Sequence, residues 1–414
     1  MRSIVKRIFR TLMPAAVALL TLTGCNDDNR WKDNPNSLLS KPEINEEIAL
    51  KVERLNQFMG REKLDGMLFT QVRNVYWITA GTANTQIVLN KDVGGASLLI
   101  MRNGEKYLIC SGSEADRLMD GGLRELGYQL KQYNWYEANK LKDTRGSIIE
   151  EIAGNGRIGS DIEFPTTILK SEEFIPLRFS LTPTELKRYR WLGHETTEAV
   201  VEVCQNIKPG MNEFEIEYLT DKALRSRGIF PTVLLIAVDQ RIFDYRHALA
   251  GGAVLKKYAM VNVVAEKWGM PIACTRFVHF GPLSEELSRK LAACANVNAC
   301  FENATVAGAK TADIFESCKE WYKSNGFEGE WKMHHQGGAT GYNDREYCIY
   351  PGINETIQEN QAFAWNPTIT GAKIEDTIIA TKDGAEVITT TEKWPMISVT
   401  INGKTYLQPG ILIR

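Results

Sequence analysis

The 414-residue chain contains five histidines, and two of them, His334 and His335, are adjacent. They lie in the stretch from Lys332 to Tyr347, which also contains a pair of glycines and Arg345. A neutral imidazole can take a proton from water and return it to a leaving nitrogen. A guanidinium can hold a carboxylate with two parallel hydrogen bonds. These residue types predict a site that binds and cleaves a small substrate.

Residues outside this stretch complete the predicted site. Taken singly, each has an ordinary structural explanation, since a lone histidine is usually hydrogen-bonded within the fold and a lone arginine usually lies on the surface. We expect the functional residues to converge in one pocket: His247, His335 and Glu375 as catalytic groups, and Arg345 and Tyr342 as substrate-binding groups. Arg276 is expected to be structural, pairing within the sheet.

The composition is that of an ordinary globular protein. Apolar residues make up 43% and charged residues 24%, and the net charge is −2. Nothing in this balance indicates a basic surface for nucleic acid. The length is sufficient for a large core and for two or three domains.

The N-terminus has the pattern of a targeting signal. A basic segment, residues 2–10, precedes an apolar run, residues 11–23, that is too short to span a bilayer as a mature helix. Leu22-Thr23-Gly24-Cys25 then resembles a bacterial lipobox. We predict a signal peptide over residues 1–24, lipidation at Cys25 and a polar tether over residues 25–40. This implies a lipid-anchored protein of the cell envelope, in the outer membrane or on the surface of a Gram-negative bacterium. The alternative is a plain cleaved secretory peptide.

Seven of the eight cysteines remain after Cys25, and none forms a C-x-x-C pair. An odd number without paired spacing argues against both a disulfide framework and a zinc knot. We expect these cysteines to be small buried hydrophobic residues.

From residue 41 onward the apolar pattern predicts an α/β protein with two domains. The first, residues 41–180, is expected to alternate helices and strands: helices 46–62, 114–126 and 145–153, strands 65–70, 128–133 and 157–161, and a hairpin of 96–101 with 106–110. The second, residues 181–414, begins with a helix capped by Thr182 or Thr184 that runs to about Ile207. The expected elements that follow are helices 213–227, 284–306 and 312–325 and strands 232–238 and 258–265.

Several motifs in this second domain occur in a known order. They are Thr182-Pro183-x-Glu185, Lys208-Pro209-Gly210-Met211-x-Glu213, His247, Thr275-Arg276, His335-x-x-Gly338, Asn366-Pro367 and Ile374-Glu375-Asp376-Thr377. Together they resemble the pita-bread fold shared by creatinase, aminopeptidase P, prolidase and methionine aminopeptidase. Residues 41–180 resemble the creatinase-like domain that precedes it. The resemblance implies an α/β N-terminal domain followed by an α+β pita-bread domain, and a hydrolase acting on a small-molecule or peptide substrate.

The resemblance also implies a metal site, and here the sequence departs from the family. Metallopeptidases of this fold hold two divalent ions with two Asp, one His and two Glu. Those positions correspond here to Asn262, Ala273, His335, Asn366 and Glu375. One carboxylate cannot neutralise two divalent cations, which prefer charged oxygen ligands. We therefore regard Asn262, Ala273 and Asn366 as vestigial and expect no metal cofactor.

Creatinase is the metal-free branch of this fold and also has Asn and Ala at the first two positions. His247 matches its acid/base histidine. Thr275, however, stands where creatinase has a catalytic glutamate, which argues against creatine as the substrate. The resemblance to creatinase still implies a related reaction, the cleavage of a C–N bond in a small substrate.

Three functions remain open at this point. The first is a metal-independent hydrolase of a C–N bond in a small peptide-like or amidine substrate. The second is a non-catalytic lipoprotein that binds a small molecule or peptide. The third is an Xaa-Pro-type aminopeptidase with one divalent ion held by His247, His335 and Glu375. A homodimer is compatible with each of them.

Overall fold

The computed structural model describes residues 38–414 of the chain. The predicted signal peptide, the lipidation site Cys25 and most of the predicted tether lie outside the described residues. Within the described part, no helix combines the length and apolar character needed to cross a bilayer.

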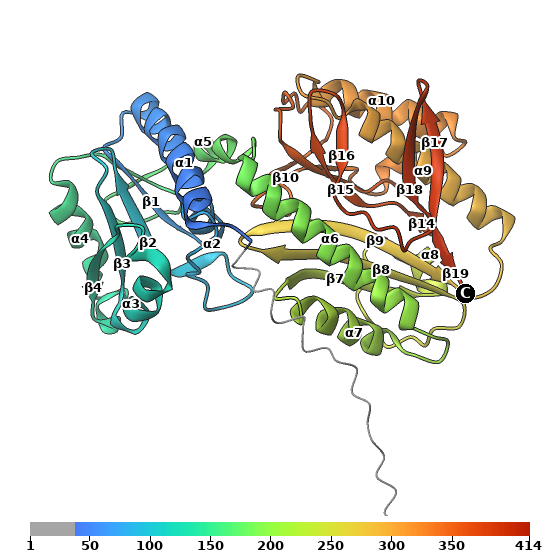
Figure 1. Ribbon diagram of the computed structural model, residues 1–414, viewed down its shortest axis with the longest axis horizontal. Coiled ribbons are helices and arrows are strands. Elements are labelled where there is room, and N and C mark those ends of the chain that lie inside the picture. The colour runs from blue at the N-terminus through green and yellow to red at the C-terminus, as the bar shows by residue number, and fades with distance from the viewer. Residues whose placement is uncertain (1–37) are drawn as a thin grey trace, which may run out of the picture. The chain divides into compact units, whose positions relative to one another are not determined.

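The first sheet has the strand order β4-β3-β2-β1-β5-β6 (Figure 1). Its strands are β1 (Gly66–Gln71), β2 (Val93–Met101), β3 (Lys106–Ser111), β4 (Gln129–Tyr133), β5 (Ile158–Ser160) and β6 (Ile168–Leu169). The predicted hairpin is present, because β2 and β3 pair antiparallel with Ala96 opposite Cys110. Strands β1 and β5 run parallel whereas β1 and β2 run antiparallel, so the sheet is mixed.

The helices of this region are α1 (Lys41–Glu62), α2 (Val72–Ile78), α3 (Gly112–Leu118), α4 (Thr144–Ala153) and α5 (Ser171–Phe174). α1 begins at a capping box in which Ser40 and Glu43 each accept the other's backbone N–H. The helix predicted over residues 114–126 is shorter than expected. Regular helix ends at Leu118 and a π turn follows, in which Gly122 adopts a φ of 124° that side chains rarely tolerate.

The second half of the chain begins with α6 (Pro183–Asn206). Of the two predicted caps, Thr182 is the one that caps the helix, and Glu185 completes a capping box with it. α7 (Glu213–Arg225) follows, and both helices pack on a four-stranded sheet of order β19-β9-β8-β7. Its strands are β7 (Phe230–Val238), β8 (Tyr258–Lys267), β9 (Met270–His279) and β19 (Ile411–Ile413), with the short helix α8 (Gln240–Asp244) after β7.

A five-stranded sheet of order β11-β10-β12-β15-β16 faces this arrangement, and α9 (Glu285–Ala304) and α10 (Thr311–Ser324) lie on its outer side (Figure 1). The strands are β10 (Gly337–Thr340), β11 (Tyr347–Cys348), β12 (Ala362–Trp365), β15 (Asp376–Ala380) and β16 (Ala385–Val387). Two further hairpins join β13 (Thr368–Ile369) to β14 (Ala372–Lys373) and β17 (Met396–Ile401) to β18 (Lys404–Pro409). Two sheets with helices outside them form the expected pita-bread architecture.

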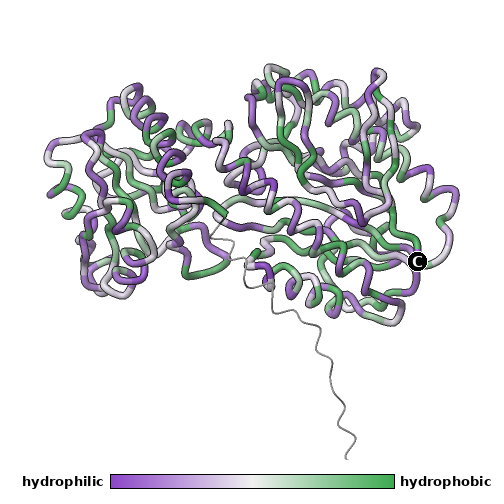
Figure 2. Tube along the Cα trace, viewed as in Figure 1, coloured by the Kyte–Doolittle hydropathy of each residue, from purple (hydrophilic) through white to green (hydrophobic). Residues whose placement is uncertain are grey.

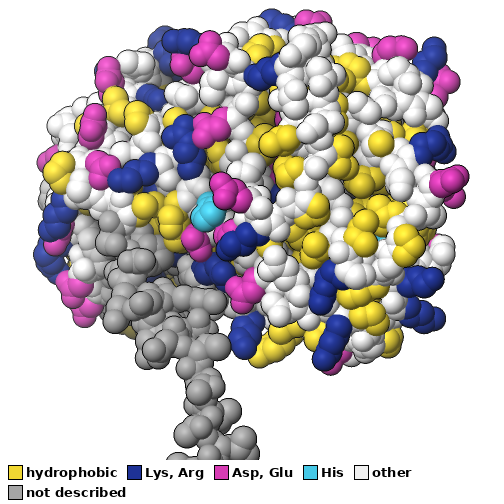
Figure 3. All heavy atoms as spheres, turned by 45° about the vertical axis from the view of Figure 1, so that its right-hand side comes forward, with side chains coloured by type: hydrophobic (Ala, Val, Ile, Leu, Met, Phe, Trp, Pro, Cys, Tyr) yellow, Lys and Arg dark blue, Asp and Glu magenta, His cyan; other side chains and the backbone are white. Residues whose placement is uncertain are grey.

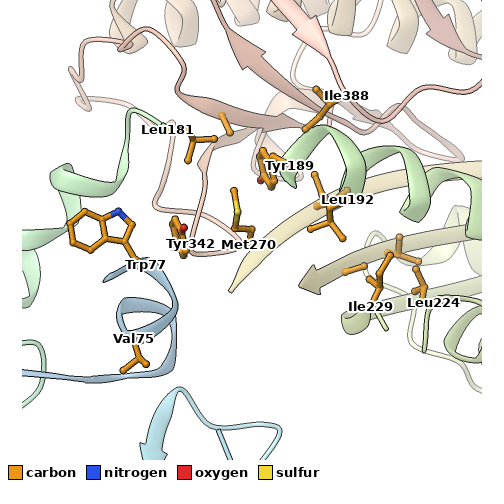
Figure 4. Packing of buried hydrophobic residues seen from close by; sticks show 14 of the residues in the cluster. Val75, Trp77, Leu181, Tyr189, Leu192, Leu224, Ile229, Met270, Tyr342 and Ile388 are labelled. Carbon is orange, nitrogen blue, oxygen red and sulfur yellow. The ribbon is translucent and has the colours of Figure 1, made fainter. Parts of the chain in front are cut away.

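The apolar residues follow this layering. Hydrophobic stretches follow the strands, whereas hydrophilic and hydrophobic residues alternate along α6 (Figure 2). One buried cluster runs from Leu55 on α1 to Trp394, so both halves contribute to the same core (Figure 4).

The seven described cysteines are free thiols and five of them are buried. On the face shown in Figure 3, acidic and basic side chains are interspersed, in agreement with the net charge of −2.

Candidate functional site

The site is built where the two sheets of the second half meet. Asn262 on β8 lies opposite Thr275 on β9. The backbone N–H of Thr275 donates to the carbonyl oxygen of Glu375, at 3.1 Å, and Glu375 lies between β14 and β15. This bridge aligns the carboxylate of Glu375 with two polar side chains that come from the other sheet.

The carboxylate of Glu375 is buried and fully engaged. The Thr275 hydroxyl donates to Oε2 at 2.7 Å, and the Asn262 amide nitrogen donates to the same oxygen. Lys373 Nζ lies 3.2 Å from Oε2, and one Arg345 nitrogen lies 3.5 Å from Oε1. Burial alone would raise the pKa of Glu375, but the charges of Lys373 and Arg345 lower it to about 2. Glu375 is therefore a fixed anion held by cations of the protein, and it does not serve as a general acid near neutral pH.

The residues at the family's metal positions do not fit a two-metal centre. Asn262 presents its amide nitrogen, a donor, to Glu375. Ala273 has no ligand atom and belongs to a small apolar cluster. Asn366 is buried, and its amide oxygen has no partner among the described residues. Only Glu375 supplies a carboxylate, and Lys373 and Arg345 already neutralise it, so nothing here compensates four positive charges.

Three imidazoles form a second group. Nε2 of His334 lies 2.7 Å from Nε2 of His247. Nδ1 of His334 lies 2.6 Å from the carbonyl oxygen of His335. One ligand atom from each of the three rings falls within 4.8 Å of the others. Because a carbonyl oxygen only accepts, Nδ1 of His334 carries the hydrogen and its Nε2 carries a lone pair. Nε2 of His247 is then the donor between the rings, and Nδ1 of His247 is an unprotonated base.

Two buried or half-buried residues hold these imidazoles together. Arg246, next to His247, forms an ion pair with Glu330 and donates to the hydroxyl of Thr370 at 2.8 Å. Gln336 donates to the carbonyl oxygen of His334 at 2.7 Å and accepts a hydrogen bond from a buried tyrosine hydroxyl. The loop that carries His247 is thus tied to the segment that carries His334, although the two are far apart in sequence.

The electrostatics link the imidazoles to the carboxylate cluster. Partial burial lowers the pKa of His334 to about 3 and that of His335 to about 4, although His335 also reaches solvent. Partial burial likewise lowers the pKa of His247. After burial, the positive charge of Lys373 has the largest effect on His334 and His247. For His335, the positive charge of Arg345 has the largest effect on the pKa after burial. The three imidazoles are therefore mainly neutral at pH 7, and the charge of Lys373 acts on all three.

Tyr342 is not part of this site, which corrects its assignment to substrate binding. It is 2% exposed, and it lies among buried hydrophobic residues near Trp77 and Met270 (Figure 4). Its hydroxyl donates to Glu185 on α6 and accepts from Lys51 on α1. Tyr342 is a structural residue of the core, because its ring is buried and its hydroxyl is already bonded to Glu185 and Lys51.

The other predicted residues lie near one another. His247 and His335 belong to the imidazole group, and Arg345 and Glu375 form an ion pair. Arg276 is buried and pairs with Asp376 at 2.9 Å, as its predicted structural role requires.

Two residues of the site were missed by sequence reasoning. His334 was quoted only as the neighbour of His335. Lys373 was not among the predicted site residues, although its spacing from Glu375 was a usable signal, because residues two apart in an extended chain point to the same side. The metal set His247, His335 and Glu375 is not what the structure assembles. The third ring in the group is His334, and Glu375 is occupied by Lys373.

Comparison with known proteins agrees with this architecture. Residues 188–382 match the sequence profile of metallopeptidase family M24. An uncharacterized peptidase of Staphylococcus haemolyticus is 22% identical over 367 residues, which cover 83% of this chain and 99% of that protein.

Solved structures show the same fold. The Xaa-Pro dipeptidase from Bacillus anthracis superposes with a TM-score of 0.71 at 19% identity, covering 89% of this chain and all of that one. The prolidase from Pyrococcus horikoshii OT3 gives a TM-score of 0.68 at 17% identity, covering 83% of this chain and 98% of that one. The chain therefore contains, over residues 188–382, a pita-bread domain of metallopeptidase family M24.

Proposed function

We propose that this domain hydrolyses a C–N bond in a small peptide-like or amidine substrate, and that it does so without a two-metal centre. The peptidase fold supports hydrolysis as the reaction class. The lack of a carboxylate at Asn262, Ala273 and Asn366 supports independence from the two metals.

The observation that carries the proposal is the oriented pair of imidazoles. His334 has its hydrogen on Nδ1, bonded to a backbone carbonyl, and accepts from His247 Nε2 at 2.7 Å. A base held by a second hydrogen-bonded group is the arrangement that general acid–base catalysis needs. The hydrogen bond fixes the tautomer of His247 and stabilises the imidazolium that forms when Nδ1 takes a proton.

Hydrolysis at this site follows from those positions. Nδ1 of His247 takes a proton from a water molecule as the water oxygen bonds to the substrate carbon. The C–N bond then breaks, and His247 returns the proton to the leaving nitrogen, so the enzyme ends as it began. A carboxylate on the substrate is attracted by Lys373 and Arg345, because two cations share the single carboxylate of Glu375.

A ligand screen followed by a turnover assay tests this proposal. Dipeptides and amidino acids are first ranked by the shift they cause in melting temperature, and those that bind are then incubated with the chain and analysed by mass spectrometry. We expect a carboxylate-bearing ligand to be cleaved, and His247→Ala to lower the rate by ~10²–10⁴-fold. The melting temperature should be nearly unchanged because His247 is exposed. Binding without cleavage by the wild-type chain would contradict the proposal and favour the non-catalytic alternative.

We propose in addition that the mature chain is anchored to a membrane through a lipid on Cys25, which the order of basic residues, apolar run and lipobox supports. Cys25→Ser should abolish labelling by a fatty-acid probe and move the protein from the membrane fraction to the soluble fraction. Continued labelling of this variant would contradict the assignment.

A further inference from the structure

We propose that His247, His334 and His335 form a binding site for one first-row transition-metal ion of the zinc type, and that the bound ion inhibits hydrolysis. This site shares only His335 with the two-metal positions of the family, because it uses none of Asn262, Ala273, Asn366 or Glu375 and adds His247 and His334. The inhibitory part rests on the proposed function, whereas the binding part stands on the geometry alone.

The hydrogen bonds leave ligand atoms pointing at one another. A metal-binding histidine characteristically donates its other ring N–H to a carbonyl or carboxylate, which fixes the tautomer and the ring orientation. His334 has this arrangement already, since its Nδ1 lies 2.6 Å from the carbonyl oxygen of His335. Its Nε2 lone pair faces Nε2 of His247 at 2.7 Å. Two imidazole nitrogens that approach so closely must share either a proton or a cation.

The distances suit an ion after a small movement. Zinc–imidazole bonds of about 2.0–2.1 Å in a tetrahedral arrangement separate two ligand nitrogens by about 3.3 Å. The pair at 2.7 Å therefore needs to open by a few tenths of an ångström. The third ring is within reach, because a ligand atom of His335 lies within 4.8 Å of the other two. His247 and His335 are exposed, so they can adjust without repacking the core.

Three neutral imidazoles select the class of ion. Imidazole suits zinc, copper and nickel, whereas magnesium and calcium prefer carboxylates and carbonyls. Three histidines leave a fourth tetrahedral position for water. The nearby ammonium of Lys373 opposes a cation, and its contact with Glu375 at 3.2 Å offsets this charge only in part, because Arg345 pairs with the same carboxylate.

The bound ion would prevent His247 from acting as the base. When Nε2 of His247 binds the metal, the hydrogen of this neutral ring must lie on Nδ1. Nδ1 is the atom that takes the proton from water in the proposed hydrolysis. The imidazole keeps one hydrogen throughout, so the change is a tautomer shift and not an ionisation. Metal binding and proton transfer at His247 are therefore mutually exclusive.

Binding is tested first without reference to activity. The untagged, chelator-treated chain is titrated with Zn²⁺ by calorimetry and with Co²⁺ by visible absorption, which reports four- or five-coordinate cobalt. We expect one ion per chain. His334→Ala should weaken binding by at least ~10–100-fold, the loss typical of a disturbed metal site. His194→Ala is the matched control, because it removes an exposed histidine that does not belong to the cluster. No saturable binding, or equal binding by His334→Ala and wild type, would overturn the site.

The activity assay then tests inhibition. With a substrate found by the ligand screen, saturating Zn²⁺ should abolish turnover, and chelator should restore it. His194→Ala should respond as the wild type does. Stoichiometric binding that raises turnover would overturn the inhibitory role and, with it, the metal-independent mechanism, while leaving the binding site in place. Full activity of the zinc-loaded chain would overturn the inhibitory role alone.

Discussion

The cluster around Glu375 and the buried network around Lys51 both remove charges from water, and they balance those charges differently. In the Lys51 network, two carboxylates share two cations: Lys51 contacts Glu47 and Glu185 at 2.6 and 2.7 Å, and Arg188 contacts Glu47 at 2.6 Å. The side chains of these four residues are at most 2% exposed.

At the candidate site, by contrast, Lys373 and Arg345 share the single carboxylate of Glu375, at the longer distances of 3.2 and 3.5 Å. Asp344 is a further carboxyl near Arg345, but burial raises its pKa. Exposed imidazoles lie beside this cluster, whereas the Lys51 network is sealed. A balanced, sealed network fixes α1 against α6, while a cluster with surplus positive charge beside exposed imidazoles is suited to an anionic ligand.

Disrupting the buried Lys51 network should lower the free energy of unfolding more than any other change proposed here. Lys51→Met leaves Glu47 and Glu185 with one cation between them, so we expect a loss of ~3–5 kcal/mol in the free energy of unfolding. Lys373→Met should cost less, under ~2 kcal/mol, because Arg345 remains beside Glu375. Urea denaturation of both variants measures the difference.

The control is Lys41→Met, which removes an exposed ion pair with Glu125 and should change stability by less than ~1 kcal/mol. Equal losses in Lys51→Met and Lys373→Met would show that the two clusters do not differ as described.

The surplus charge at the site predicts an effect on ligand binding. Arg345→Lys keeps the charge but loses the planar fork, so a carboxylate ligand should bind at least ~10-fold more weakly, or ~1.4 kcal/mol. Calorimetric titration with a ligand from the screen measures this. The same substitution at Arg190, which pairs with Glu386 on the exposed surface, provides the control and should leave affinity unchanged. An unaltered affinity in Arg345→Lys would exclude a bidentate contact.

The smallest expected effect is a change in acid stability. The pKa of Glu375 in the fold is about 2, below its ordinary value of 4.5. A depressed pKa contributes stability that is present above pH 4.5 and is lost as the pH falls toward 2. Glu375→Gln should therefore flatten this part of the stability curve.

Glu302 provides a comparison of opposite sign, because burial raises its pKa from 4.5 to about 8. The stability that Glu302 contributes is lost as the pH rises from 4.5 to about 8. Glu302→Gln should therefore flatten the dependence of the free energy of unfolding on pH over this range. Chemical denaturation at a series of pH values separates the two. A Glu375→Gln curve parallel to that of the wild type below pH 4.5 would contradict the assigned pKa.

The sequence predicted those features that depend on residues close together in the chain. The cap of α6 at Thr182 and the hairpin of β2 and β3 depend on residues only a few positions apart, and both are present. The convergence of Thr275 and Glu375 depends on pairing across 100 residues, which spacing alone does not reveal.

Where the structure differs from the predicted site, the origin is the same. Tyr342 was assigned by its neighbours in the sequence, yet its ring packs into the core against residues from α1 and α6. His335 was chosen over His334 by matching a motif, whereas the hydrogen bond to His247 comes from His334. Neighbouring side chains in an irregular segment point in different directions, and the sequence does not show which one reaches its partner.

The most direct test of the central claim is the rate of peptide or amidine hydrolysis by the untagged chain after its metals have been removed by chelation and quantified by elemental analysis. The rate is compared between the wild type, His247→Ala and His194→Ala. The expected result is turnover by metal-free wild type and His194→Ala, and a rate lower by ~10²–10⁴-fold in His247→Ala. Hydrolysis that stops on chelation and returns in proportion to one or two added ions per chain would contradict it.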